Sequence, residues 1–148
     1  MVKAIFLLSF LATAVIAVEV HRCGDAYPHP TAVVIPGCNA MPCPVPNNSD
    51  FSFAVEFESS IATNSLAVNV TASLGPFNLP YDTPEHLRDG CANIDANCPL
   101  TAGQRVTMRG TAPVEAPIIG VTVRMRFEIT GDSAQKVVCF AADVRLVA

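Results

Sequence analysis

Six cysteines constrain this chain more than any other feature of its sequence, because all of them follow an apolar N-terminal run. The run "AIFLLSFLATAVIA" begins after Lys3 and ends at Ala17, and a basic residue before a short apolar stretch closed by small residues is typical of a secretory signal peptide. An even number of cysteines in an exported chain favours disulfides over free thiols. We therefore expect residues 1–17 to be a signal peptide, with cleavage after Ala14 as the alternative, and residues 18–148 to form one disulfide-bonded domain.

The spacing of the cysteines favours one pairing among the many that six cysteines allow. Two close pairs, separated by four and six residues, would each close a small loop, and the remaining two cysteines would join the ends of the domain. Neither close pair has the spacing of a redox-active Cys-x-x-Cys motif, and the scattered histidines offer no further zinc ligands. We therefore expect no metal site, and the predicted disulfides are Cys38–Cys43, Cys91–Cys98 and Cys23–Cys139.

The charge and the polar residues exclude several classes of function. The chain has 13 acidic and 9 basic residues and a net charge of −4, without the clustered positive charge that binding to nucleic acid requires. No apolar stretch after Ala17 approaches the roughly 20 residues needed to span a bilayer. The three histidines lie in no recognisable catalytic motif. We therefore expect a non-enzymatic protein with no catalytic residue, no cofactor and no nucleic-acid partner.

Apolar residues alternate with polar ones along several segments, which indicates β-strands with one buried face. In "DFSFAVEFE" every second residue from Phe51 to Phe57 is apolar, and in "GVTVRMRFEIT" every second residue from Val121 to Ile129 is apolar. In "VVCFAADVRLV" the same alternation points Cys139 away from the core. At least six such short segments are separated by Pro, Gly and Asn turns, which predicts an all-β sandwich of two sheets with antiparallel strands. The absence of Trp argues against a true immunoglobulin domain.

Two segments carry apolar side chains although their prolines and glycines predict irregular structure. "LGPFNLPYDTPEHLRDGC" contains Phe77, Leu79 and Tyr81, and "GTAPVEAPIIG" contains Val114 and two isoleucines. Both segments can fold over one end of the sandwich and seal a dry core. Alternatively, they form the lip of an apolar pocket between the sheets, because ligand pockets are lined mainly by such side chains. The pattern is compatible with both structures.

The order of motifs along the chain resembles that of a known family. The motifs "CG", "PGC-x4-C", "GPFNLPY", "DGC-x6-CPL" and "VTVRMRFEITGD" follow one another between Cys23 and the C-terminus. This order is similar to that of the MD-2-related lipid-recognition (ML) family. Within the family it is similar to the secreted and lysosomal carriers of the Niemann-Pick type C protein 2 group, which also resembles the group-two mite allergens. The resemblance implies an immunoglobulin-like sandwich with three disulfides and a sterol or other lipid held between its sheets.

The resemblance also implies positions for the ligand-binding residues. Pocket positions of the family correspond to Phe51, Phe77, Val114 and residues 118–119. Residues 118–119 are isoleucines where the sterol carriers typically have an aromatic residue and proline, and Phe127 stands where they have Trp, so a fatty acid or hydrocarbon fits as well as a sterol. With neighbouring apolar residues, the candidate ligand-binding residues are Phe51, Phe53, Phe77, Leu79, Tyr81, Val114, Ile118, Ile119, Val121, Val123 and Phe127.

The sequence thus predicts a secreted carrier that holds one hydrophobic molecule and exchanges it with a membrane or a lipid-transfer protein. The expected ligand is a sterol or a fatty-acid-like lipid, and the expected state is a monomer in extracellular fluid or in the endosomal and lysosomal lumen. A lipid-presenting adaptor of innate immunity and a chemosensory carrier of hydrophobic ligands are the alternatives. Asn47 and Asn69 begin N-x-S/T sequons and are candidate glycosylation sites.

Overall fold

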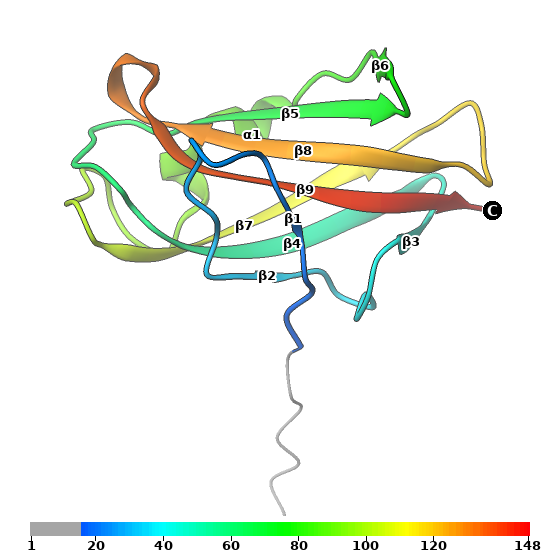
Figure 1. Ribbon diagram of the computed structural model, residues 1–148, viewed down its shortest axis with the longest axis horizontal. Coiled ribbons are helices and arrows are strands. Elements are labelled where there is room, and N and C mark those ends of the chain that lie inside the picture. Colours follow the sequence, from blue (N-terminus) through cyan, green and yellow to red (C-terminus); the bar gives the residue numbers. More distant parts are fainter. Residues whose placement is uncertain (1–15) are drawn as a thin grey trace, which may run out of the picture.

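The computed structural model describes residues 16–148, in which two β-sheets lie face to face (Figure 1). The predicted signal peptide lies outside the described residues, apart from Ile16 and Ala17. No helix among residues 16–148 is long and apolar enough to cross a membrane. The short helical segments are α1 (Glu85–Arg88), η1 (Gly90–Asn93) and η2 (Asp132–Ala134). The strands are β1 (His21–Arg22), β2 (Ala32–Val34), β3 (Cys43–Pro46), β4 (Ser49–Glu58), β5 (Ala67–Leu74), β6 (Phe77–Leu79), β7 (Arg105–Val114), β8 (Thr122–Thr130) and β9 (Lys136–Val147).

The strand order confirms the predicted two-sheet sandwich. The larger sheet has the order β1-β9-β8-β5-β6, and the smaller sheet has the order β2-β4-β7. Neighbouring strands on both paths pair antiparallel. β3 differs, because it pairs parallel with β9, from Cys43 opposite Val144 to Pro46 opposite Val147. β3 was not among the segments predicted as strands, and it covers the part of the β9 edge that the two-residue β1 leaves unpaired.

Alternation of buried and exposed residues holds in β4 but not throughout β9. In β4 the apolar residues at every second position from Phe51 to Phe57 are at most 8% exposed. Cys139 of β9, expected to face away from the core, is only 1% exposed. Its side chain does point away from the opposite sheet, but Cys23 is bonded to it and its backbone N–H donates to the carbonyl of Pro28 at 3.0 Å. The N-terminal segment therefore buries this outer position, which alternation along one strand does not predict.

Three disulfides join the cysteines in the pairing that their spacing favoured. The Cys23–Cys139 bond connects positions 116 residues apart, whereas the other two bonds span 5 and 7 residues. A cross-link that closes a longer loop restricts the unfolded chain more strongly. The Cys23–Cys139 bond joins the segment that follows β1 to strand β9. We therefore expect it to stabilise the fold more than the other two bonds, Cys38–Cys43 and Cys91–Cys98.

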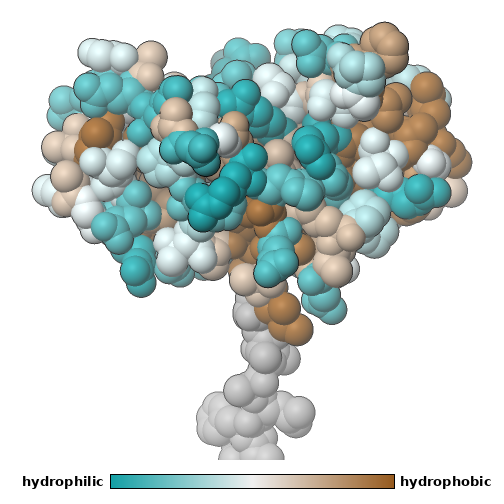
Figure 2. Space-filling model, in the orientation of Figure 1, coloured by the Kyte–Doolittle hydropathy of each residue, from teal (hydrophilic) through white to brown (hydrophobic). Residues whose placement is uncertain are grey.

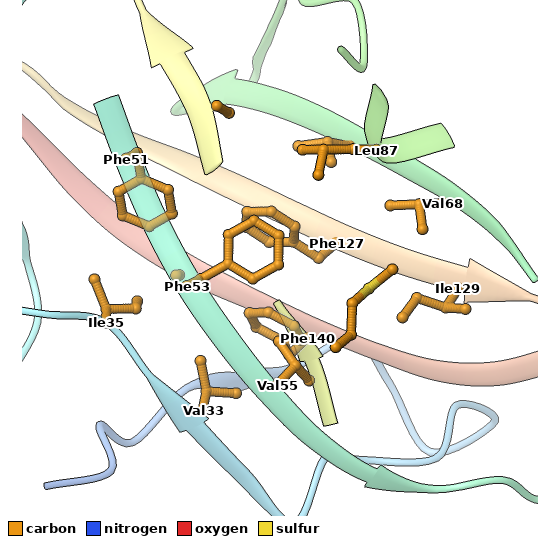
Figure 3. Close-up of a cluster of buried hydrophobic side chains, with 14 of the residues drawn as sticks. Val33, Ile35, Phe51, Phe53, Val55, Val68, Leu87, Phe127, Ile129 and Phe140 are labelled. Carbon is orange, nitrogen blue, oxygen red and sulfur yellow. The ribbon is translucent and has the colours of Figure 1, made fainter. Parts of the chain in front are cut away.

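Aromatic rings bridge the two sheets near the centre of the sandwich (Figure 3). Phe53 of β4 packs against Phe127 of β8 with ring centroids 5.1 Å apart. Phe127 in turn stacks on Phe140 of β9 at 4.9 Å. Leu87 of α1 inserts beside these rings and is 1% exposed. The centre of the sandwich is therefore close-packed, and any ligand space has to lie toward one of its ends.

Candidate functional site

A cavity of about 250 Å³ opens between the sheets at one end of the sandwich, and its lining includes residues of β6 and of the loop between β7 and β8. Figure 1 shows β6 and this loop at the same end of the molecule. The walls of the cavity come from β4 to β9, together with the segment after β6 and the loop 115–121. Ala72 of β5 and Ala112 of β7 face inward and are 6% and 7% exposed. Sheets that pack face to face lie about 10 Å apart, so two such small side chains leave the space between them unfilled.

Phe51 and Phe127 line the inner end of the cavity. Phe53 lies behind them, with its ring centroid 6.2 Å from that of Phe51 and 5.1 Å from that of Phe127. Figure 3 shows the three rings together in the space between the strands. This aromatic cluster separates the cavity from the close-packed centre of the sandwich.

Nearly every group that faces the cavity is apolar. Among the lining residues, Glu115 is the only charged one, and Tyr81 supplies a hydroxyl group. The Tyr81 hydroxyl is neutral at physiological pH, as in any ordinary tyrosine, and burial raises its pKa further. No basic side chain of the described residues lines the cavity, so an anionic head group would find no cationic partner there. The cavity is therefore suited to a neutral and mostly apolar molecule.

The mouth of the cavity carries exposed apolar side chains. Figure 2 shows apolar residues gathered at the end of the molecule where Figure 1 places the loop between β7 and β8. In this loop Ile118 is 56% exposed and Ile119 is 50% exposed, and Phe77, which begins β6, is 70% exposed. Exposed apolar groups beside a cavity mark a contact surface when they lie together.

Most of the predicted ligand-binding residues meet at the cavity. Phe53 does not line it, because it belongs to the core behind Phe51, and Phe77 and Ile119 lie at the mouth without lining the cavity. Direct contact of any of these residues with a ligand stays a prediction. The predicted residues that line the cavity are Phe51, Leu79, Tyr81, Val114, Ile118, Val121, Val123 and Phe127.

The segments expected to be irregular are partly strands. Phe77–Leu79 forms β6, which pairs with β5, and Val114 ends β7, where it lies opposite Ser49 of β4. The expectation of irregular structure is wrong at these positions, because β6 and β7 are the outer strands of their sheets and pair their backbone groups with β5 and β4. The first segment also contains the short helix α1, whereas residues 80–84 and the loop 115–121 lack regular structure.

Reasoning from the sequence missed several lining residues. Ala112 and Ala116 belong to this group, and nothing in their local pattern distinguishes them from other alanines. The larger missed residues do lie on strand faces that were predicted to point inward, so the inward alternation is the signal that could have found them. These residues are Leu74, Met125, Val144 and Leu146.

The histidines lie apart from one another and from the cavity. Nε2 of His21 lies 3.0 Å from Oδ2 of Asp143, and Nε2 of His86 lies 2.6 Å from the carbonyl oxygen of Thr111. Nδ1 of His29 has no hydrogen-bond partner among the described residues, and burial lowers the pKa of this histidine. None of the three lines the cavity. Within residues 16–148, no three His, Cys, Asp or Glu side chains gather as a metal site.

The two glycosylation sequons have different surroundings. Asn69 is an exposed residue on the outer face of β5. Asn47 lies between β3 and β4, and its carboxamide is hydrogen-bonded to the backbone of Ala116 in the loop at the mouth. Attachment of a glycan to either residue stays a prediction.

A family model described as "ML domain" matches residues 17–146, which is nearly the whole of the described chain. The chain belongs to the ML domain family. This membership confirms the resemblance that the order of motifs indicated.

Known proteins are similar to this ML domain protein over most of its length. The "NPC intracellular cholesterol transporter 2" of Canis lupus familiaris is 25% identical over 130 residues, which cover 88% of this chain and 85% of the relative. The "Ecdysteroid-regulated 16 kDa protein" of Manduca sexta is 24% identical over 108 residues, 73% of this chain and 72% of the relative. The crystal structure of a Niemann-Pick type C2 protein from the Japanese carpenter ant has a TM-score of 0.75 at 15% identity, covering 87% of this chain and 99% of that chain, and so shares the fold.

Proposed function

We propose that this ML domain protein is a secreted, non-enzymatic carrier that holds one hydrophobic molecule between its two sheets. The observation that carries the proposal is the apolar cavity of about 250 Å³, closed at its inner end by Phe51 and Phe127. Membership of the ML domain family supports a lipid as the ligand. The dog relative is named as a cholesterol transporter, which supports a sterol among the candidates.

The ligand is a neutral lipid in preference to an ionised fatty acid. Glu115 would repel a carboxylate at the cavity wall, and no basic residue of the described chain lines the cavity to attract one. The neutral hydroxyl of Tyr81 can bond to a hydroxyl or carbonyl group of the ligand. A sterol, a long-chain alcohol or a hydrocarbon satisfies these conditions, whereas a fatty acid has to leave its carboxylate at the mouth in water.

Burial of apolar surface is sufficient to hold such a ligand. Enclosing roughly 300–400 Å² of ligand surface at about 25 cal/mol per Å² contributes about 8–10 kcal/mol. The loss of ligand freedom reduces this gain, so affinities between about micromolar and nanomolar follow without an ionic bond. The cavity of about 250 Å³ is smaller than most ligand sites. A bulky ligand such as a sterol therefore extends through the mouth or displaces the loop 115–121.

Exchange of the ligand takes place at the mouth, through transient contact with a membrane or a lipid-transfer protein. The exposed side chains of Phe77, Ile118 and Ile119 support this contact, because they offer an apolar surface beside the opening. A lipid that leaves the cavity there crosses less water than one that leaves from a polar surface. The three disulfides and the apolar N-terminal run support release of the protein into extracellular fluid or the endosomal and lysosomal lumen.

Identification of the bound molecule tests the proposal directly. We expect protein purified from the medium of secreting eukaryotic cells to release one neutral lipid per chain on extraction, detected by mass spectrometry. We also expect unlabelled sterols and long-chain alcohols to displace a fluorescent sterol at pH 7 more readily than fatty acids do. Protein that yields no lipid and binds none of these probes would contradict the carrier function. Turnover of lipid esters by the pure protein would contradict its non-enzymatic character.

A further inference from the structure

The side chain of Asn47 holds the loop that forms one side of the cavity mouth. Its Nδ2 donates to the carbonyl oxygen of Ala116 at 2.9 Å, and its Oδ1 accepts from the backbone N–H of the same residue, also at 2.9 Å. Paired residues of adjacent antiparallel strands exchange the same two hydrogen bonds. The carboxamide of Asn47 therefore pairs with Ala116 as a neighbouring strand would.

The turn that carries Asn47 is itself fixed to both sheets. The backbone N–H of Asn47 donates to the carbonyl of Val147, at the end of β9 in the larger sheet, with an N–O distance of 2.8 Å. The backbone N–H of Asn48 donates to the carbonyl of Val114, at the end of β7 in the smaller sheet, also at 2.8 Å. Asn47 thus has a rigid base from which to position Ala116.

Within the described part of the protein, the two bonds between Ala116 and Asn47 are the only hydrogen bonds that the segment 115–119 makes. The next one along the chain joins the N–H of Gly120 to the carbonyl of Leu146 at 2.7 Å. Pro117 and Ile118, which lie between these two attachments, line the cavity. Loss of the bonds at Ala116 would therefore free this wall of the mouth over its whole length.

We propose that Asn47 is a positioning residue of the ligand site and that its carboxamide carries no glycan in the folded protein. The sugar would be bonded to Nδ2. In a trans secondary amide the substituent on nitrogen lies on the same side as the carbonyl oxygen. The N–H that reaches Ala116 lies on that same side, because Oδ1 also bonds to Ala116. The glycan and the pair of hydrogen bonds therefore exclude each other, whereas the exposed Asn69 has no such conflict.

Asn47→Asp is the decisive variant, because it replaces only the Nδ2 donor. At neutral pH the carboxylate cannot donate to the Ala116 carbonyl. We expect a bound fluorescent sterol to dissociate about tenfold faster, the factor that corresponds to one lost hydrogen bond and an unpaired acceptor. The second carboxylate oxygen would face the Ala116 carbonyl oxygen and repel it, so the pair should open although Oδ1 remains as an acceptor. Protection of the Ala116 amide against hydrogen exchange, measured by NMR, should therefore fall in parallel. Asn69→Asp is the matched control, since it makes the same chemical change at the other sequon, on the exposed outer face of β5, and should keep both values of the wild type.

The pH dependence of the Asn47→Asp variant separates positioning of the loop from a general loss of stability. A protonated carboxyl group has one donor and one acceptor, as the carboxamide has in this pair of bonds. We therefore compare the variant with the wild type at each pH as the pH is lowered to about 4, near the usual pKa of Asp. The dissociation rate and the amide exchange rate of the variant should then approach those of the wild type. A variant that is merely less stable would move further from the wild type in acid.

Glycan occupancy provides a second and independent test. In peptide maps of protein secreted by eukaryotic cells, we expect the peptide that contains Asn47 to be unmodified. A glycan on most molecules at Asn47, or wild-type exchange and dissociation in Asn47→Asp at pH 7, would overturn the proposal. This inference rests on the proposed function only for the dissociation rate. If the wild type binds no lipid, the carrier function fails, but amide exchange at Ala116 and the peptide map still decide the role of Asn47.

Discussion

Gly110 of β7 lies opposite Phe53 of β4, and the ring of Phe53 occupies the space that a side chain on Gly110 would need. A Cβ atom at Gly110 would lie 2.5 Å from Cζ of Phe53 and 2.9 Å from a methyl carbon of Leu87. The glycine therefore allows β4 and α1 to pack together directly behind the inner end of the cavity.

Substitution of Gly110 by Ala should overpack this region. We expect Gly110→Ala to lower the free energy of unfolding by about 1–3 kcal/mol, since a close-packed core accommodates an added methyl group only by strain. Thermal and denaturant unfolding would measure the change. Phe53→Leu in the Gly110→Ala background should recover part of the loss, because it removes the atoms in conflict. Unfolding of Gly110→Ala at the wild-type temperature would show that the ring of Phe53 is not confined there.

Val114 and Ile119 offer a matched pair for testing the cavity. Val114 lines the cavity, whereas Ile119 is 50% exposed and does not. Val114→Phe puts a ring into the space for the ligand and should weaken binding of a fluorescent sterol by about tenfold or more, equivalent to at least about 1.4 kcal/mol. Ile119→Phe should leave the affinity within about a factor of two. Equal affinities of the two variants, with a lower melting temperature only for Val114→Phe, would indicate a dry core.

The apolar residues at the mouth should govern the rate of exchange rather than the affinity. Phe77→Ser combined with Ile119→Ser removes exposed apolar groups that do not line the cavity. We expect slower transfer of a fluorescent sterol to neutral lipid vesicles, by about threefold to tenfold, with an unchanged equilibrium affinity. Stopped-flow fluorescence would measure the transfer rate. Transfer at the wild-type rate would argue against contact of this surface with membranes.

The long disulfide should contribute more stability than the short ones. Replacement of Cys23 and Cys139 together by Ala should lower the free energy of unfolding by about 2–5 kcal/mol, because this bond closes the longest loop. The same change at Cys38 and Cys43 should have a smaller effect. Urea unfolding would compare the two variants. Intact protein should also contain no titratable thiol, and the presence of one would contradict the disulfide framework.

Asp143 should make stability depend on acid pH. Hydrogen bonds from Arg124, and then from His21, hold the pKa of Asp143 below its usual range. A carboxyl group with a lowered folded-state pKa stabilises the fold above its unfolded pKa of about 3.9, and this contribution is lost as the pH falls through the folded-state pKa. Asp143→Asn should therefore cost about 1 kcal/mol at pH 7, a value kept small because Arg124 is half exposed.

Denaturant unfolding between about pH 2 and pH 7 would measure this dependence. The difference between the wild type and Asp143→Asn should shrink as the pH falls below about 4. A difference that stays constant over this range would mean that ionisation of Asp143 does not contribute to stability.

Much of the fold was predictable from the sequence because its signals are local. The alternation from Phe51 to Phe57 identifies the buried face of β4 without knowledge of any other strand. The close spacing within two cysteine pairs likewise left Cys23 to join Cys139. The parallel pairing of β3 with β9 was not predictable, because it depends on which part of a distant strand edge β1 leaves open.

The sequence by itself determined the inward faces of the strands, the favoured pairing of the cysteines and the family, since each follows from short-range periodicity, spacing or motif order. Only the tertiary structure decided where those faces leave a cavity. Ala72 and Ala112 lie on opposite sheets, and they create space only because the fold brings two small side chains to the same end. Asn47 and Ala116 are 69 residues apart in the sequence, which marked Asn47 only as a candidate glycosylation site. The hydrogen bonds between its carboxamide and Ala116 could be found only in the folded structure.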